Sequence, residues 1–148
     1  MEEIKAFRGK FRGKHKRTNR WIEGAYHRHL NYTPYCVGDS VKPTDYKHLI
    51  ICDASSDWGM PRGIDIHEID PSTLGECTGV PDKNGRLIYE GDIVKMKSYN
   101  GGYHNTVVYF RDGKFAVDGS HYHYKDICTR SVEIIGNIHD NPELVNIK

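Results

Sequence analysis

Two pairs of histidines are the residues of this sequence best spaced to hold a metal ion. His27 and His29 are separated by one residue, as are His121 and His123. Side chains two positions apart on a strand point the same way, so either pair could reach one ion. Neither pair is followed by an acidic or thiol residue at the spacing of a metal site. We therefore predict no native metal site and no cofactor, and regard adventitious binding of nickel or zinc as the alternative.

The cysteines do not suggest a zinc site or a disulfide framework. Structural zinc sites usually take their ligands in close pairs, and disulfide frameworks are typical of short, cysteine-rich secreted chains. Here no two cysteines form a CxxC pair, and the intervals between them are 16, 25 and 51 positions. We expect buried, reduced thiols. The four residues are Cys36, Cys52, Cys77 and Cys128.

No segment has the motif of a catalytic site. The sequence contains no GxSxG nucleophile motif, and Cys128 lies in no recognisable catalytic motif. Gly9–Lys14 resembles a phosphate-binding loop, but its spacing is one residue short. His15 also stands where such a loop has the Ser or Thr that binds magnesium. We therefore predict no catalytic residue and no enzyme activity.

A basic run near the N-terminus is the strongest candidate for binding a charged partner. Residues 1–20 hold eight basic and two acidic side chains, a net charge of +6, whereas the remaining residues sum to −5. Aromatic residues interleave with this run, and single-strand binders pair cations for phosphates with aromatic rings for bases. The alternative is a solvated hairpin with a basic exposed face. The candidate nucleic-acid-binding residues are Lys10, Arg12, Lys14, Lys16, Arg17 and Arg20.

The elements that must position these residues are short strands. Gly (15) and Tyr (10) are prominent, which favours strands and tight turns. The segment Ile64-Asp65-Ile66 alternates between apolar and polar residues, as a half-buried strand does. Residues 9–19 read as a basic turn, and residues 31–46 and 53–63 read as loops. We expect strands at 4–8, 21–26, 48–52, 64–69, 87–89, 93–97, 106–110, 114–117 and 132–138.

Turn and cap residues support this pattern. Asn84-Gly85 predicts a type I′ hairpin turn, and Asp112-Gly113 predicts a second hairpin. Asp70 is placed to cap one helical turn over Pro71–Leu74, and 141–144 reads as a closing turn or short helix. Strands at this spacing, without a helix of three turns, favour a barrel or sandwich.

Length and hydropathy limit the location and the number of domains. The 148 residues make one domain or two small lobes. No apolar run approaches the roughly 20 residues of a membrane-spanning helix, and the first residues lack a secretory signal. We expect a cytoplasmic protein with no membrane partner.

The chain resembles the YopX-like proteins of phages and prophages. The segment Cys77–Val94, which reads CTGVPDKNGRLIYEGDIV, is similar to that family's central signature, and Ile135–Leu144 is similar to its closing motif. Residues 4–10 with Trp21 and Gly24 resemble the family's opening. The segment Ile66–Ile69, followed by Pro71, Thr73, Leu74 and Gly75, is also similar and runs into the central signature. Two departures are Ala6, which splits the opening motif, and Cys77, which stands where an aromatic residue is usual.

The resemblance implies a single YopX-like domain over 1–148, a phage-borne accessory protein of a bacterial host cell. It implies a mostly β fold, with an N-terminal β lobe over about 1–75 and an SH3-like barrel over about 76–148. Glu90 and Asp92 then form turns rather than a catalytic pair. The resemblance implies no activity. We therefore expect a non-enzymatic binding or adaptor module that contacts protein, either a second copy or another phage or host protein, with nucleic-acid binding by the basic segment as the alternative.

Overall fold

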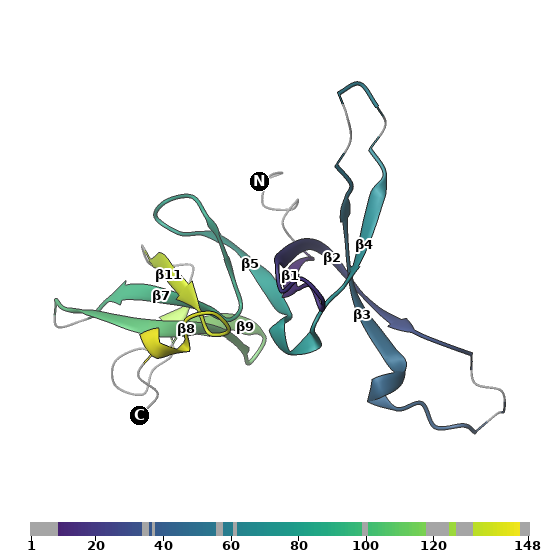
Figure 1. Ribbon diagram of the computed structural model, residues 1–148. Coiled ribbons are helices and arrows are strands. Elements are labelled where there is room, and N and C mark those ends of the chain that lie inside the picture. The colour runs from purple at the N-terminus through teal and green to yellow at the C-terminus, as the bar shows by residue number, and fades with distance from the viewer. Residues whose placement is uncertain are drawn as a thin grey trace. The chain divides into compact units, whose positions relative to one another are not determined.

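The computed structural model describes residues 9–33, 36, 38–55, 58–60, 62–98, 101–117, 125–126 and 132–145. Within this part the chain is mostly β, its strands pair antiparallel, and its helical elements are single 3-10 turns. The expectation of a mostly β fold with little helix is confirmed. The chain divides into an N-terminal unit, Gly9–Leu74, and a C-terminal unit, Gly75–Lys148 with Met1–Arg8 (Figure 1).

The N-terminal unit is built from four strands in the order β4-β3-β2-β1. Each strand pairs antiparallel with the next along the chain, so the four strands form a meander. Two 3-10 turns, η1 and η2, precede β3 and follow β4. The elements are β1 (Lys10–Lys14), β2 (Trp21–Leu30), η1 (Pro43–Asp45), β3 (Tyr46–Asp53), β4 (Ile64–Glu68) and η2 (Pro71–Thr73).

The outer strands of this unit meet at one end. The backbone N–H of Lys16 donates to the carbonyl of Glu68 over 3.0 Å, and His15 forms an antiparallel bridge with Ile69. The N–H of Asp70 donates to the carbonyl of the last residue of β1, at 2.8 Å. The strands therefore bend around an inner face, on which Ile50 and Ile69 are completely buried.

Two glycines permit the close approach of strands on that inner face. A Cβ atom on Gly24 would overlap the carbonyl oxygen of Ile51 on the neighbouring strand. A Cβ atom on Gly13 would overlap the side chain of Ile69. Both positions therefore need a residue without a side chain.

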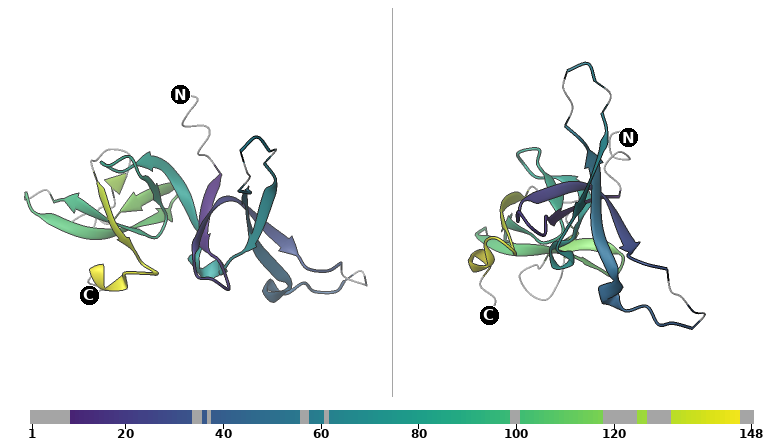
Figure 2. Two further views of the ribbon diagram at one scale, coloured as in Figure 1. Left: turned by 45° about the horizontal axis from the view of Figure 1, so that its top comes forward. Right: turned by 45° about the vertical axis from the view of Figure 1, so that its right-hand side comes forward.

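The C-terminal unit contains a five-stranded sheet in the order β10-β9-β8-β7-β11 and the antiparallel pair β5-β6. The described strands do not close into a barrel. The core of this unit consists of Ile88, Val94, Met96, Val108, Val117 and Val132. The elements are β5 (Gly75–Pro81), β6 (Leu87–Tyr89), β7 (Asp92–Lys97), β8 (Tyr103–Arg111), β9 (Lys114–Val117), β10 (Lys125–Asp126), β11 (Glu133–Asn137) and η4 (Pro142–Leu144) (Figure 2).

A buried carboxylate, that of Asp82, joins the β5–β6 turn to β11. It accepts backbone N–H groups from Asn84 (2.8 Å), Arg86 (2.9 Å) and Ile134 (3.3 Å). The Arg86 guanidinium adds two further hydrogen bonds and also donates to the Ile134 carbonyl. Burial alone raises the pKa of Asp82, but these hydrogen bonds outweigh it and lower the pKa to about 2.

Several local predictions are confirmed. Gly85 and Gly113 have positive φ, and Asp70 caps η2 by accepting the N–H of Ser72 at 3.0 Å. Asp92 is a turn former, because its carboxylate accepts the N–H of Tyr89 at 2.9 Å. The closing 3-10 turn also lies where expected.

Three local predictions need correction or remain outside the described residues. The prediction of a type I′ turn at Asn84-Gly85 is wrong, because only the glycine has positive φ there. A type I′ turn occurs instead at Asp112-Gly113, where both residues have positive φ. Residues 9–19 were expected to be a turn, but β1 lies within them. The expected strand at 4–8 lies outside the described residues.

Replacing Gly24 tests the close approach of β2 and β3. We expect Gly24→Ala to lower the free energy of unfolding by about 2–3 kcal/mol, because the new methyl group must displace backbone rather than a mobile side chain. Gly63→Ala is the matched control, since its Cβ would make only ordinary contact, 3.7 Å from the Ala54 Cβ atom. Equal melting temperatures for the two variants would contradict this account.

The Asp82 carboxylate predicts a specific loss of stability in acid. Its folded-state pKa of about 2 lies below the ordinary value of 3.8, so its contribution is complete above about pH 4 and is lost as the pH falls toward 2. We expect Asp82→Asn to cost roughly 2–4 kcal/mol at pH 7 and to flatten this dependence. Denaturant unfolding between pH 2 and 7 measures both effects. Asp112→Asn, at an exposed turn, should change neither.

Candidate functional site

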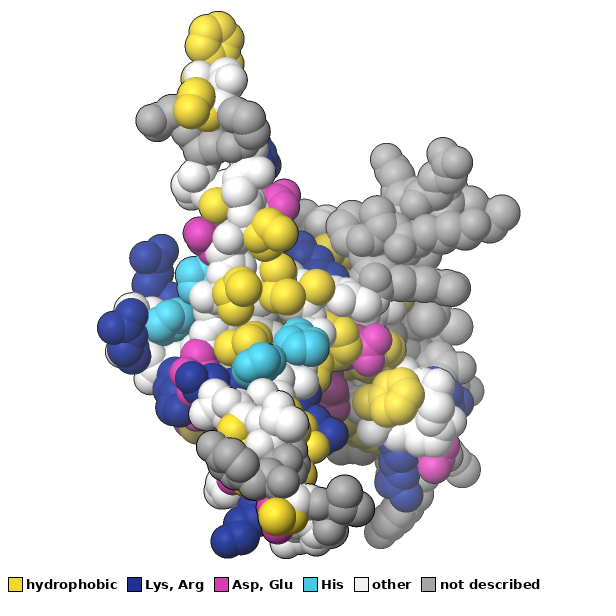
Figure 3. All heavy atoms as spheres, turned by 90° about the vertical axis from the view of Figure 1, so that its right-hand side faces the viewer, with side chains coloured by type: hydrophobic (Ala, Val, Ile, Leu, Met, Phe, Trp, Pro, Cys, Tyr) yellow, Lys and Arg dark blue, Asp and Glu magenta, His cyan; other side chains and the backbone are white. Residues whose placement is uncertain are grey.

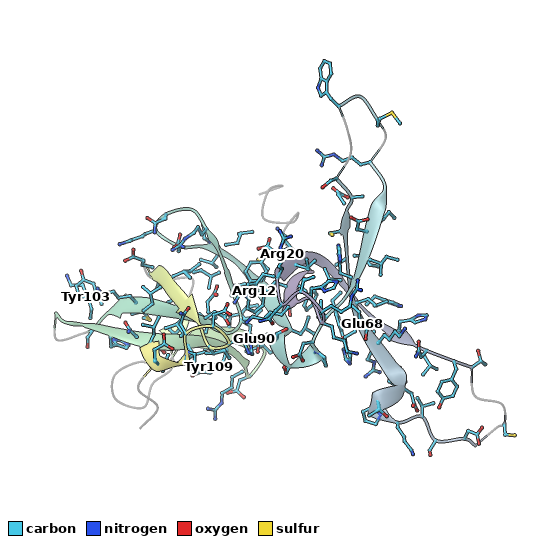
Figure 4. The ribbon with its side chains drawn as sticks, in the orientation of Figure 1. Arg12, Arg20, Glu68, Glu90, Tyr103 and Tyr109 are labelled. Atoms are coloured by element: carbon cyan, nitrogen blue, oxygen red, sulfur yellow. The ribbon has the colours of Figure 1, made fainter. Side chains whose placement is uncertain are left out.

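The basic candidate residues lie on the β1–β2 hairpin, and four of the six have a described side-chain contact. Lys10 pairs with Glu23 at 2.9 Å and Lys16 pairs with Glu68 at 2.6 Å. The Lys16 ammonium lowers the pKa of Glu68, chiefly through this hydrogen bond. These two cations are therefore neutralised by neighbouring carboxylates. Figure 4 labels one of these carboxylates, that of Glu68.

Two more of the basic residues, Arg12 and Lys14, lie over the ring of Trp21. The Arg12 guanidinium lies 4.8 Å and the Lys14 ammonium 5.5 Å from the Trp21 ring centroid. Lys14 is only 7% exposed, and its backbone N–H donates to the Thr73 hydroxyl at 2.8 Å. A buried lysine in a strand is not a mobile basic arm, so this part of the nucleic-acid hypothesis loses a contact residue.

The remaining two basic residues, Arg17 and Arg20, are exposed on the turn. His15 organises this turn, because its Nδ1 atom accepts the backbone N–H groups of Arg17 and Thr18, each at 3.2 Å. Two of the six candidates, Arg17 and Arg20, thus present exposed side chains to solvent.

Of the two histidine pairs considered as metal ligands, the structure describes one. His121 and His123 lie outside the described residues. His27 and His29 lie on one face of β2 with ring centroids 6.0 Å apart. No group of three or more metal-ligating side chains occurs in the described part of the chain.

The cysteines differ in exposure. Cys77 is buried and Cys52 is half-buried, but Cys36 is exposed, so the expectation of a buried thiol is wrong for Cys36. Burial raises the pKa of the Cys52 thiol, and the carboxylates of Asp65 and Asp53 raise it further. This thiol is therefore a poor nucleophile at neutral pH. Cys128 lies outside the described residues.

A shallow hollow of about 330 Å³ opens in the N-terminal unit. Its two charged side chains, Lys16 and Glu68, satisfy each other, and its histidine, His48, has Nδ1 2.7 Å from the Tyr26 hydroxyl. The hollow therefore offers little unsatisfied polarity to a ligand. Its lining is Lys16, Pro43, Thr44, Tyr46, His48, Glu68, Ile69 and Pro71.

The outer face of the same strands carries exposed apolar side chains. Registered neighbours Ala25, Ile51 and Ile66 form one row across β2, β3 and β4, and Leu49 and Ile64 lie on the same face. Ile64 and Ile66 are 72% and 63% exposed. We call these five residues the outer apolar face. Figure 3 shows hydrophobic side chains gathered on one side of the molecule with histidines beside them.

The sequence analysis found β4 but misjudged its side chains. Alternation at Ile64 and Ile66 predicted burial of these residues, whereas the structure turns them to solvent and turns His67 inward. Alternation identifies which residues share a face, but it does not say which face is covered.

The connection between β3 and β4 carries two more exposed apolar residues. Trp58 is fully exposed and Met60 is 65% exposed. The hairpin that bears them extends away from the other strands of its unit (Figures 1 and 2). We call residues 53–65 the arm. Thus the arm and the outer apolar face together place four strongly exposed large apolar residues between positions 58 and 66.

Comparison with known proteins gives the family. The sequence profile of the family described as "YopX protein" matches residues 10–146. The chain belongs to the YopX protein family. The match covers nearly the whole chain, so the resemblance noted in the sequence motifs is confirmed. No curated protein matches this YopX-family chain.

A solved structure shows the same fold. Protein EF1440 from Enterococcus faecalis, known from its crystal structure, is similar to this YopX-family protein with a TM-score of 0.51 and 22% sequence identity. The similarity covers 91% of this chain and 96% of that chain. At this identity the likeness shows the fold alone. Among the described residues, no helix has the length and hydropathy needed to cross a membrane.

The pairing of the basic residues predicts weak nucleic-acid binding at most. We expect no micromolar binding to single- or double-stranded DNA or RNA near physiological salt. The two exposed cations, Arg17 and Arg20, would give only about a 12-fold loss of affinity between 50 and 200 mM salt, since each neutralised phosphate contributes a slope of about 0.9. Fluorescence anisotropy with labelled oligonucleotides measures this.

The informative variant is Arg17→Glu with Arg20→Glu, because both side chains are exposed and their reversal leaves the strands intact. Lys14 is left unchanged in this test, because Lys14→Glu would bury a carboxylate and unfold the hairpin. Tight, salt-sensitive binding that the double variant abolishes would establish the nucleic-acid hypothesis instead.

Proposed function

We propose that this YopX-family protein is a non-enzymatic binding or adaptor module that acts through protein–protein contacts. The observation that carries the proposal is the exposure of Ile64 and Ile66 on a strand, beside Leu49 and Ile51. Soluble monomers rarely expose a contiguous apolar patch above a few hundred square ångströms, and larger patches mark interaction sites. The outer apolar face and the arm are therefore the proposed contact surface.

The composition of this surface fits a protein partner better than a nucleic acid. Tryptophan and methionine are enriched at protein interfaces, and Trp58 and Met60 stand on the arm. Phosphate recognition needs clustered cations, whereas the basic hairpin has Lys10 and Lys16 in ion pairs and Lys14 buried. Exposed isoleucines contribute nothing to phosphate binding.

The family and the fold extend the proposal in two respects. We propose that the protein is a phage or prophage accessory protein acting in the bacterial cytoplasm, as its YopX-family membership favours. We also propose that the C-terminal unit is an SH3-like barrel lobe of a single YopX-like domain. The antiparallel order β10-β9-β8-β7-β11, together with the β5–β6 hairpin, supports this assignment.

Site-specific photo-crosslinking in living bacteria tests the protein-binding function. A photoreactive residue at position 66 should yield a discrete protein adduct, because this side chain lies in the proposed contact surface. The same residue at position 103 is the matched control, since Tyr103 is 67% exposed but lies in the C-terminal unit. An absence of protein adducts at position 66, or adducts only with nucleic acid, would refute the proposal.

A further inference from the structure

The strand β4 directs part of its backbone away from the sheet. It lies at the end of the strand order, next to β3. The N–H of Ile69 donates to the carbonyl of His48 at 2.9 Å, and the carbonyl of Gly63 accepts an N–H from the end of β3 at 3.0 Å. Hydrogen-bonded residues alternate along an antiparallel ladder, so the odd-numbered residues of β4 face β3 with their backbone groups. The even-numbered residues Ile64 and Ile66 therefore direct their N–H and C=O groups outward.

The same edge is paired further along the chain. The backbone of residues 14–16 runs antiparallel to residues 68–70 and forms hydrogen bonds of 2.8 and 3.0 Å with it. Ile64 and Ile66 lie beyond this pairing. In the part of the chain that the structure describes, no hydrogen bond engages their outward N–H and C=O groups. The edge therefore opens at a definite point, where a further strand could continue the line of residues 14–16.

The side chains of this open stretch alternate between apolar and acidic. Natural proteins usually block an exposed edge with a lysine, a proline or a bulge. Ile64 and Ile66 are instead exposed and β-branched, and the β3–β4 register beside them is continuous. Asp65 lies between them with its exposed side chain on the opposite side of the strand. Among the described residues, no cation forms an ion pair with this carboxylate.

We propose that β4 binds an extended peptide segment of a partner protein, which joins the sheet as an antiparallel strand beside Ile64 and Ile66. Backbone hydrogen bonds from both isoleucines hold the segment, and its alternating side chains select it. The two segment residues opposite the isoleucines are apolar, because their side chains lie on the outer apolar face. The residue between them is lysine or arginine, because it lies opposite the Asp65 carboxylate.

A second copy of β4 does not have this pattern. Two β4 strands can pair about a two-fold axis so that Ile64 of each lies opposite Ile66 of the other, which engages the outward groups of all four isoleucines. The same register places the two Asp65 carboxylates directly opposite each other. Like charges at directly opposite positions destabilise a pair of strands. A segment of a different protein with a basic residue at this position fits the edge better.

The inference rests on the proposed function, since it names the chemistry of the partner at the same surface. The first measurement is amide hydrogen exchange in the free full-length protein, followed by nuclear magnetic resonance. The amides of Ile64 and Ile66 should exchange at least about tenfold faster than those of Asp65 and His67, which are bonded to β3. Slow exchange of all four amides would overturn the inference, because the edge would already be covered.

Peptide binding tests the partner chemistry. The probes are two labelled peptides of about nine residues, with Val-Arg-Val or Val-Glu-Val at the centre and serine and threonine on either side. We expect the arginine peptide to bind about fivefold more tightly than the glutamate peptide and to slow the exchange of the Ile64 and Ile66 amides. Asp65→Lys should reverse this preference. Asp112→Lys, which changes an exposed carboxylate of the C-terminal unit, is the control and should leave the preference unchanged.

A proline at the open edge tests the backbone contacts. Ile64→Pro removes one outward N–H but no hydrogen bond to β3, and proline is tolerated at the first residue of an edge strand. We expect this variant to bind the arginine peptide about tenfold more weakly than Ile64→Val, which keeps the N–H and a β-branched side chain. Thermal melting checks that both variants fold. Equal affinities for two folded variants would show that the outward N–H takes no part in binding.

The outcomes separate this inference from the broader function. Binding of neither peptide at about 1 mM, or equal binding of both, overturns the inference. If the position 66 crosslink then joins another protein in cells, the protein-binding function stands and the partner is recognised in a different way. A position 66 adduct between two copies of this chain also overturns the inference, because the occupant is then a second copy. If neither peptide binds and position 66 yields no protein adduct, both proposals fail.

Discussion

The hydrogen-bonded carboxylate of Asp82 is the interaction on which the C-terminal unit most depends. Its two oxygens accept N–H groups from Asn84 and Arg86 in the β5–β6 turn and from Ile134 in β11, segments some 50 residues apart along the chain. A neutral side chain could not satisfy so many donors at this buried position. The carboxylate thereby sets the register in which the hydrophobic core residues, including Ile88 and Val132, come together. The ionised state is maintained by the donors themselves, which lower the pKa despite burial.

The N-terminal unit is held by a different constraint, the close approach of neighbouring segments at two glycines. Gly13 and Gly24 let the strands approach closely enough for β1 and the end of β4 to meet. This bend encloses a small inner face around Ile50 and Ile69 and leaves the opposite face outside. A four-stranded meander this short cannot cover both of its faces with its own side chains. The bend that buries Ile50 and Ile69 on the inner face thus leaves Ile64 and Ile66 exposed on the outer face.

The sequence allowed much of the strand order and several turns to be predicted, because these depend on local residue types. Asp70 followed by a proline specifies its capped turn, and Gly113 specifies positive φ whatever the surroundings. The strand β1 escaped prediction because its alternating positions hold lysine and arginine, which read as a polar turn. Trp21 lies against the cationic groups of Arg12 and Lys14, and Glu23 of β2 pairs with Lys10, contacts that local sequence does not reveal.

The candidate site was harder to predict than the fold. The charge run near the N-terminus drew attention to the basic hairpin, yet long-range ion pairs neutralise part of it. The apolar surface instead depends on which side of β4 is covered, and that is decided by the bend at Gly13 and Gly24 rather than by β4 itself. Trp58 stood in a segment that reads as an ordinary loop, since glycine and proline surround it.

The two tryptophans occupy contrasting environments, and this gives the protein its own optical reporters. Trp58 is fully exposed to solvent on the arm, whereas the ring of Trp21 lies against the cationic groups of Arg12 and Lys14. Fluorescence from the first indole should be red-shifted and readily quenched by iodide, while the second should be shielded from a quencher on its covered side. Covering of the arm by any partner would shift the first emission to the blue, and loosening of the hairpin would change the second. Events in the two parts of the N-terminal unit can therefore be followed separately in unlabelled protein.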